Sequence, residues 1–157
     1  ANSGTCYDLT LVKYITDSSG SVLKENKATV HNTLDLPQEL WDTIHAGMRG
    51  VVQNHSAFSA QAAPAFNGST GLAGAGKTGT AQQSKDKPNH GLFIGYTNSP
   101  STGDAEYAIA VRIANGYTSG NACLTANDIL KYIYNLADED TILTGYASSD
   151  TSNTSND

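Results

Sequence analysis

The chain has 157 residues, of which 38% are hydrophobic and 15% are charged, a balance typical of one globular domain rather than of a charge-rich disordered chain. Fifteen acidic against nine basic residues give a formal net charge of −6, which disfavours nucleic acid and anionic lipid surfaces as main partners. No apolar run approaches the roughly 18 residues of a membrane-spanning helix.

The first predicted element is a strand over residues 7–16, YDLTLVKYIT, where Tyr7, Leu9 and Leu11 alternate onto one face. Residues 17–21, DSSGS, supply turn chemistry, and residues 22–26, VLKEN, predict a short return strand. The chain is thus predicted to open with a β-hairpin.

A helix is expected over residues 36–54, with Asp35 as its N-cap, Pro37 in its first turn and Gln38 completing a D-x-x-Q box. Its apolar residues recur every four positions and form one stripe. We assign this stripe to core packing: Leu40, Ile44, Met48 and Val52.

Three strand-like segments follow, at residues 75–82, 90–98 and 105–115. Their short, polar connections predict antiparallel neighbours, because a parallel return needs about a dozen residues or more. A last helix is expected from Thr125, with Asp128 completing a capping box. Its predicted apolar face consists of Ile129, Leu130, Ile133 and Leu136.

Cysteines and histidines indicate no metal or cofactor site. Cys6 and Cys123 lack a C-x-x-C spacing, and the four scattered histidines have no metal-ligand spacing. Both a disulfide in an oxidising compartment and two reduced, small hydrophobic side chains remain open for the cysteines.

Residues 71–82, GLAGAGKTGTAQ, fit two motifs that share Lys77. Through Thr78 they satisfy G-x-x-x-x-G-K-[ST], a phosphate-binding loop, which needs a buried strand before it and a helix beginning at the lysine. The preceding residues 64–70 are turn formers, and residues 79–90 have no helical apolar stripe. We therefore reject the nucleotide-binding interpretation.

The other motif is K-T-G, Lys77-Thr78-Gly79, in a strand of small residues. Glycine inside a strand often marks the close approach of another backbone, so an extended peptide could pair with this edge. Lys77 would present a fixed charge, and Thr78 and Thr80 would present hydroxyls, to a ligand that ends in a carboxylate. An ordinary surface lysine is the alternative that the spacing leaves open.

The order of these segments resembles the transpeptidase domain of class B penicillin-binding proteins. The resemblance covers residues 1–137 and leans, through the wording of the helix, toward the elongation-type (cell-shape) branch. Its parts are the end of the domain at 71–82, 90–99 and 105–116, the helix between the S-x-N and K-T-G motifs at 34–52, and the strand and hairpin that follow S-x-N at 1–23.

The resemblance implies an α+β fold, with an antiparallel sheet and flanking helices, that forms part of the penicillin-binding/β-lactamase-like transpeptidase fold. It also implies acyl transfer, in which a serine attacks the D-Ala-D-Ala end of a peptidoglycan stem peptide and β-lactams trap that serine. Lys77 would set the field around the serine and attract the substrate carboxylate, which Thr78 and Thr80 would contact. The Thr80 N–H would donate to the oxyanion, and Gly79 would leave room for the substrate.

Further implied partners are the rest of the transpeptidase domain and a cell-wall synthesis complex, and no nucleic acid. The implied location is the extracytoplasmic face of the bacterial cell membrane, with the anchor outside these residues. Residues 1–137 would be the C-terminal portion of the domain, and residues 138–157, rich in Ser, Thr and Asp, a disordered tail.

The family also needs S-x-x-K and S-x-N before K-T-G. Ser21 and Lys24 have the first spacing but fall in the predicted hairpin, and Ser119 and Asn121 have the second but follow Lys77. We therefore expect the nucleophile to be absent from this chain, and apolar surface to be left uncovered, which favours self-association. The rival hypothesis is a non-catalytic module that holds an extended peptide along the glycine-rich edge.

Overall fold

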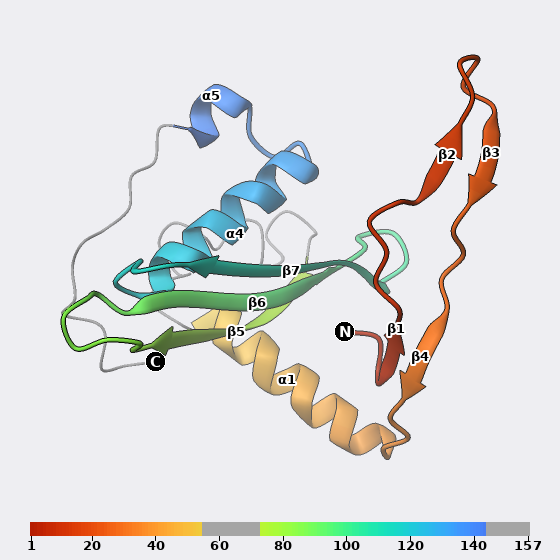
Figure 1. The fold of residues 1–157 in the computed structure, drawn as a ribbon. Coiled ribbons are helices and arrows are strands. Elements are labelled where there is room, and N and C mark those ends of the chain that lie inside the picture. Colours follow the sequence, from red (N-terminus) through yellow and green to blue (C-terminus); the bar gives the residue numbers. More distant parts are fainter. Residues whose placement is uncertain (55–72, 144–157) are drawn as a thin grey trace. The chain divides into compact units, whose positions relative to one another are not determined.

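The structure, a computed structural model, describes residues 1–54 and 73–143. The chain divides into two compact units, residues 2–41 and, together with Ala1, the residues from 42 onward. In chain order the elements are β1 (Thr5–Tyr7), β2 (Tyr14–Thr16), β3 (Val22–Glu25), β4 (Val30–Thr33), α1 (Gln38–Asn54), β5 (Ala73–Ala81), β6 (His90–Asn98), β7 (Ala105–Ile113), α4 (Ser119–Ile133) and α5 (Glu139–Ile142) (Figure 1).

The first unit contains the predicted hairpin, in which β2 and β3 pair antiparallel. Its turn is organised by Asp17, whose carboxylate accepts hydrogen bonds from the Ser19 hydroxyl at 2.6 Å and the Ser21 N–H at 3.0 Å. These bonds, with that from Ser19 foremost, lower the pKa of Asp17. The single strand predicted over residues 7–16 is wrong, because β1 ends at Tyr7 and β2 begins at Tyr14. β1 instead pairs with β4, a strand that was not predicted.

The second unit is built on an antiparallel sheet with the strand order β5-β6-β7. All three strands were predicted, and the bounds of β6 coincide with the prediction. β5 and β6 pair without a bulge, so that Lys77 lies opposite Ile94 and Thr80 lies opposite Gly91. The predicted α+β architecture with an antiparallel sheet is confirmed.

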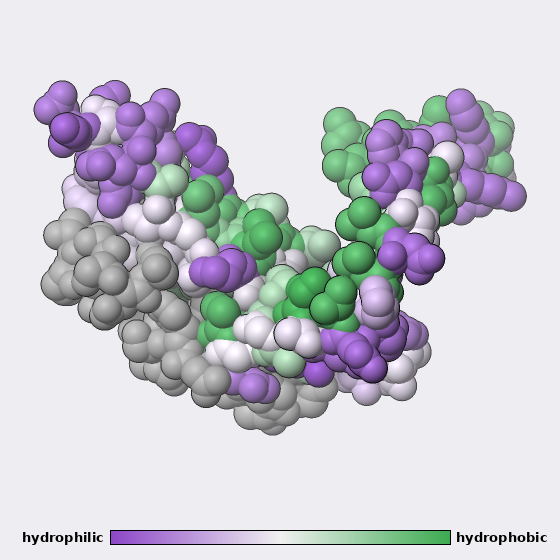
Figure 2. All heavy atoms as spheres, turned by 90° about the horizontal axis from the view of Figure 1, so that it is seen from below, coloured by the Kyte–Doolittle hydropathy of each residue, from purple (hydrophilic) through white to green (hydrophobic). Residues whose placement is uncertain are grey.

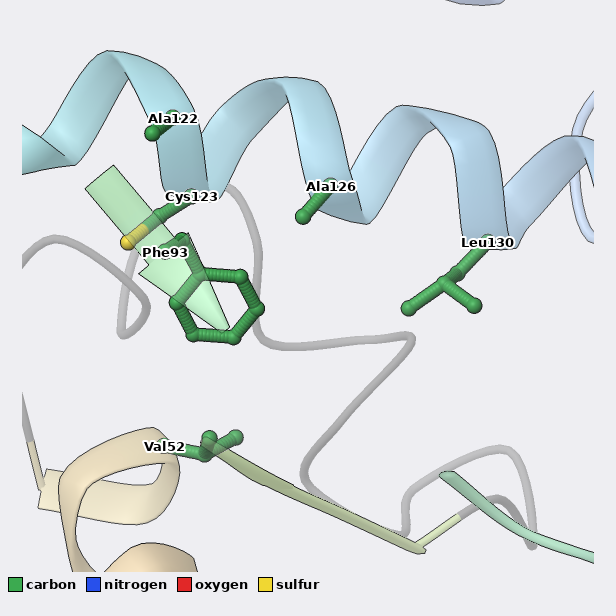
Figure 3. Close-up of a cluster of buried hydrophobic side chains, with 6 residues drawn as sticks. All are labelled: Val52, Phe93, Ala122, Cys123, Ala126 and Leu130. Atoms are coloured by element: carbon green, nitrogen blue, oxygen red, sulfur yellow. The ribbon is translucent and has the colours of Figure 1, made fainter. Parts of the chain in front are cut away.

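Helix α4 packs on this sheet through small side chains. Phe93 of β6 lies against it in a buried cluster with Val52, Ala122, Cys123, Ala126 and Leu130 (Figure 3). Residues 122, 126 and 130 recur every four positions and form the buried stripe of the helix. The predicted apolar face is therefore correct only at Leu130, since Ile129, Ile133 and Leu136 are exposed.

The start of α4 also differs from the prediction. The helix begins at Ser119, and Thr118 is its N-cap, with a side chain that accepts a hydrogen bond from the Gly120 N–H at 3.3 Å. Thr125 lies within the helix and donates its hydroxyl proton to the Asn121 carbonyl oxygen at 2.9 Å. The Thr125–Asp128 capping box is therefore wrong.

A tyrosine just beyond the last turn of α4 ties the helix to the far end of the sheet. The Tyr134 hydroxyl donates to the Glu106 carboxylate at 2.7 Å and lies 2.8 Å from the Thr97 hydroxyl. Desolvation of the phenol, with the nearby Glu106 carboxylate as a further cause, raises the pKa of Tyr134 to about 12. The phenol therefore stays neutral at physiological pH and keeps its hydrogen bond to Glu106.

Helix α1 begins at Gln38, so that Pro37, and not Asp35, precedes its first residue. Only one end of the predicted apolar stripe is buried. Val52 is 1% exposed, whereas Leu40 and Ile44 are 49% and 44% exposed. Assigning the whole stripe to core packing is therefore wrong for Leu40 and Ile44, which the described residues leave about half exposed.

Three smaller findings concern the remaining predictions. Within the described residues, Cys6 and Cys123 are not joined by a disulfide, and Cys6 is exposed while Cys123 is buried. α5 occupies the start of the segment predicted as a tail, and residues 144–157 lie outside the described ranges. No helix in these ranges is long and apolar enough to cross a membrane.

Candidate functional site on strand β5

Strand β5 carries the K-T-G motif at the margin of the sheet. It pairs with β6 on one side, and no second strand joins it among the residues that the structure describes. Lys77 lies in the middle of this strand rather than at the beginning of a helix. A phosphate-binding loop requires the opposite arrangement, so the structure excludes that interpretation of Lys77.

The pairing register assigns the side chains of the motif to two faces. Residues directly opposite each other in an antiparallel pair project to the same face of the sheet. Thr78 lies opposite Phe93, which packs against α4, so Thr78 and Thr80 lie on the α4 face. Lys77 and Gly79 alternate with them onto the other face.

The ammonium group of Lys77 nevertheless forms hydrogen bonds with the next residue of the strand. Its Nζ donates to the Thr78 carbonyl oxygen at 2.9 Å and lies 3.4 Å from the Thr78 hydroxyl. Lys77 is exposed, whereas Thr78 is 6% exposed. The charge of Lys77 and the hydroxyl of Thr78 thus lie at one place on the strand, although their Cα–Cβ bonds point to opposite faces.

Thr80 is connected to the beginning of α4. The Ser119 N–H donates to the Thr80 hydroxyl oxygen at 3.3 Å. Ser119 is the first residue of the S-x-N match that the sequence placed in the wrong order. The Asn121 amide of the same match donates to the Gly116 carbonyl oxygen at 2.9 Å. Ser119 and Asn121 are both buried and order the beginning of a helix.

The S-x-x-K match lies in the hairpin, as predicted. Ser21 belongs to the turn, and Lys24 lies on β3. The Ser21 hydroxyl lies 3.0 Å from the Ser19 hydroxyl within the turn, and Lys24 pairs with Ile15 on the strand, so Ser21 and Lys24 are not one helical turn apart. On a helix the same spacing would bring them together.

The sequence did not single out the groups that support β5 from neighbouring elements. His90 was considered only as a metal ligand, for which it has no partner at a suitable spacing. The buried ring of His90 bonds to Gln83 and Asn115, which follow β5 and β7. A signal was present in the sequence, since His90 begins a predicted strand directly after the polar connection that leaves β5. Within the described ranges, no three metal-ligating side chains gather at this site or elsewhere.

Comparison with known proteins identifies the family. The family model of the penicillin binding protein transpeptidase domain matches residues 1–135. The chain belongs to this transpeptidase family. A search of curated proteins found no match to the sequence.

Two solved structures show the same partial transpeptidase fold. The D,D-transpeptidase domain of a peptidoglycan glycosyltransferase from Eggerthella lenta superposes with a TM-score of 0.64 and 24% identity, over 87% of this chain and 29% of that one. Penicillin-binding protein 2B from Streptococcus pneumoniae superposes with a TM-score of 0.52 and 22% identity, over 80% of this chain and 21% of that one. The chain thus spans less than a third of the length of either structure.

Proposed function

We propose that this chain is the C-terminal part of a peptidoglycan D,D-transpeptidase domain and contributes the K-T-G wall of its active site. The observation that carries the proposal is the position of Lys77, Thr78, Gly79 and Thr80 on an edge strand within a chain of this family. The substrate would be the D-Ala-D-Ala end of a stem peptide, and β-lactams would bind at the same place.

Lys77 and Thr78 would receive the substrate carboxylate. Their ammonium and hydroxyl groups lie 3.4 Å apart, close enough for both to donate to one carboxylate. The positive charge would also favour the ionised form of a nearby serine during attack. Lys77 is exposed, so a substrate can reach it from solvent.

Thr80 would supply an oxyanion donor through its backbone. Along a regular strand, residues two positions apart direct their N–H and C=O groups to the same side. The Thr80 N–H therefore lies on the same margin of β5 as the Thr78 carbonyl, which the Lys77 ammonium reaches at 2.9 Å. Removing one such donor typically raises the barrier by about 3 kcal/mol.

The nucleophilic serine would come from outside residues 1–157. Ser21 and Lys24 lie in a hairpin rather than one turn apart on a helix, and Ser119 is buried at the beginning of α4. These placements support an incomplete site that the rest of the domain completes. Because the match extends over less than a third of the solved structures, acyl transfer by the whole protein also belongs to this proposal.

A fluorescent penicillin tests the proposal. The chain of residues 1–157, purified alone, should not be labelled. The full-length protein should be labelled on a serine outside these residues, and Lys77→Ala should lower its labelling rate at least tenfold by removing the charge beside the serine. Labelling of the isolated chain on one of its own serines would show that the nucleophile has been wrongly placed.

The proposal extends to the branch of the family, the partner complex, the cellular location and the domain bounds. We propose the elongation-type branch, a cell-wall synthesis complex as partner, and a location on the extracytoplasmic face of the bacterial membrane, with the anchor outside these residues. We also propose that residues 1–137 belong to the transpeptidase domain and that residues 138–157 form a tail. Complementation of a cell-shape defect by the full-length gene would test the branch.

A second function is favoured by one observation, the open margin of β5 among the described residues. A non-catalytic module could hold an extended peptide there through main-chain hydrogen bonds. The coding sequence before residue 1 discriminates between the two. S-x-x-K and S-x-N in that order support the enzyme, whereas a start codon immediately before residue 1 supports the module.

A further inference from the structure

The turn between β7 and α4, residues 114–118, brings the Ser119 N–H to the Thr80 hydroxyl oxygen. Its backbone is strained in two places, since Asn115 and Tyr117 have φ values of +53° and +66°. Asparagine tolerates this left-handed region, but a bulky tyrosine rarely adopts it. Strained residues persist only where their surroundings hold them, and they cluster at functional sites.

The beginning of β6 holds this turn. The Asn115 N–H donates to His90 Nδ1 at 2.9 Å, and the Tyr117 N–H donates to the Asn89 carbonyl oxygen at 3.0 Å. Gly91 allows the close approach, because a Cβ there would lie 2.3 Å from the Thr118 carbonyl oxygen. Both left-handed residues are thus anchored through their N–H groups to Asn89 and His90, the residue before β6 and its first residue.

The hydrogen bonds of His90 define its tautomer. A backbone N–H can only donate, so Nδ1 accepts from Asn115, and the ring proton lies on Nε2. Nε2 then donates to the Gln83 side-chain oxygen at 2.6 Å. His90 is 7% exposed, and its ring connects the residues that follow β5 with the turn that follows β7.

We propose that His90 is a positioning residue for the K-T-G strand. It holds the strained turn at Asn115, the turn places the Ser119 N–H, and this N–H holds the side chain of Thr80 on β5. The inference rests on the proposed function, in which Thr80 contacts substrate and supplies an oxyanion donor. His90 itself would touch neither the substrate nor the reacting atoms.

The test is the acylation rate of the full-length protein with a fluorescent penicillin. His90→Ala should slow acylation by about tenfold or more, since small displacements of catalytic groups can cost up to about a hundredfold. His90→Asn retains an acceptor where Nδ1 stands but does not reach Gln83, so it should recover most of the rate. Gln83→Ala, which leaves the bond to Asn115 intact, should slow acylation less than His90→Ala.

Two matched controls separate positioning from general loss of stability. Tyr134→Phe removes hydrogen bonds to Thr97 and Glu106 at the far end of the sheet, and it should lower the melting temperature without changing the rate. His31→Ala removes an exposed histidine that pairs with Asp8, and it should change neither quantity. A wild-type rate in His90→Ala, or an equal slowing in Tyr134→Phe, would overturn the inference.

Amide hydrogen exchange gives a readout that does not depend on activity. In His90→Ala the Ser119 and Asn115 amides should exchange faster, whereas amides near Tyr134 should keep their protection. Unchanged exchange at Ser119 would overturn the positioning role even if the protein reacts with penicillin. A wild-type protein that penicillin does not label would instead overturn the proposed function, and the exchange result would still decide the role of His90.

Discussion

Two positions of β5, Gly76 and Gly79, differ in why they lack a side chain. A Cβ on Gly76 would lie 2.5 Å from the Phe93 ring and 2.7 Å from the Ile94 carbonyl oxygen, so Gly76 is required by the packing under α4. A Cβ on Gly79 would meet only the Leu92 side chain, at 3.4 Å, which is close to ordinary van der Waals contact. The fold therefore does not require glycine at position 79, whereas the substrate path of the proposed function would require it.

Substituting these glycines separates fold from function. Gly76→Ala should destabilise the full-length protein by about 1–3 kcal/mol, because the methyl group overpacks the cluster around Phe93. Gly79→Ala should leave the free energy of unfolding within about 1 kcal/mol of the wild-type value, since alanine is no worse than glycine inside a strand. It should nevertheless slow acylation by penicillin at least tenfold, because the methyl group would lie where the substrate backbone approaches.

Denaturant unfolding and labelling kinetics on the same two variants check this expectation. The positions are three apart on one strand, so Gly76→Ala is the natural control for any general effect of altering β5. If Gly79→Ala reacted at the wild-type rate, no substrate would lie along this part of the strand.

At the scale of elements, α4 begins where its cap is satisfied rather than where the sequence pattern is strongest. Thr125 and Asp128 imitate a capping box, but they stand inside a helix whose buried stripe already starts at Ala122. Thr118, with extended backbone angles of −140° and 155°, is the residue whose side chain accepts from the first turn. Thr118 therefore caps the helix, whereas Thr125 lies within it.

A pair of alanine substitutions tests the corrected start of α4. Thr118→Ala should lower the free energy of unfolding by about 1 kcal/mol, because the Gly120 N–H loses its acceptor. Thr125→Ala should lower the free energy of unfolding by less than about 0.5 kcal/mol. The Asn121 carbonyl, which accepts from the Thr125 hydroxyl, lies within the helix and is not an orphan group at its end. Urea unfolding of both variants measures the difference, and an equal or larger loss in Thr125→Ala would contradict the assigned cap.

The elements that the sequence predicted well are those with a strong local period. Residues 90–98 and 105–113 are rich in β-branched and aromatic side chains between polar turns, and both form strands. β1 and β4 were not recognised as a pair, because each has only three or four residues and their pairing joins distant parts of the chain. Short strands carry too few side chains for alternation to reveal them.

For the candidate site, the sequence predicted the motif but not the contacts that hold its strand in place. The K-T-G motif is recognised directly at residues 77–79, and the small residues around it predicted a strand. The bonds from His90 to Asn115 and from Ser119 to Thr80 join residues 25 and 39 positions apart. Such contacts depend on the sheet register and on a strained turn, and no local pattern in one sequence encodes them.

At the scale of the whole molecule, apolar surface is abundant on the first unit. Leu9 and Leu11 are fully exposed, and Val22 and Leu23 of β3 are 59% and 68% exposed. Figure 2 shows hydrophobic residues, green, in patches between hydrophilic ones, purple. A two-stranded hairpin is marginally stable in water by itself, so this unit needs a partner surface. Under the proposed function, this surface would be the rest of the transpeptidase domain.

The double substitution Leu9→Lys with Leu11→Lys should therefore make the isolated chain less prone to self-association and the full-length protein less stable. In the isolated chain it should reduce self-association, measured by analytical ultracentrifugation, because it removes exposed apolar area. In the full-length protein it should lower the free energy of unfolding by about 3 kcal/mol or more, since two leucines would lose their burial. Thr10→Lys is the matched control, because it adds a charge between them and leaves both leucines in place. A full-length double variant as stable as Thr10→Lys would mean that the rest of the domain leaves Leu9 and Leu11 uncovered, and the partner surface would have to be sought elsewhere on this unit.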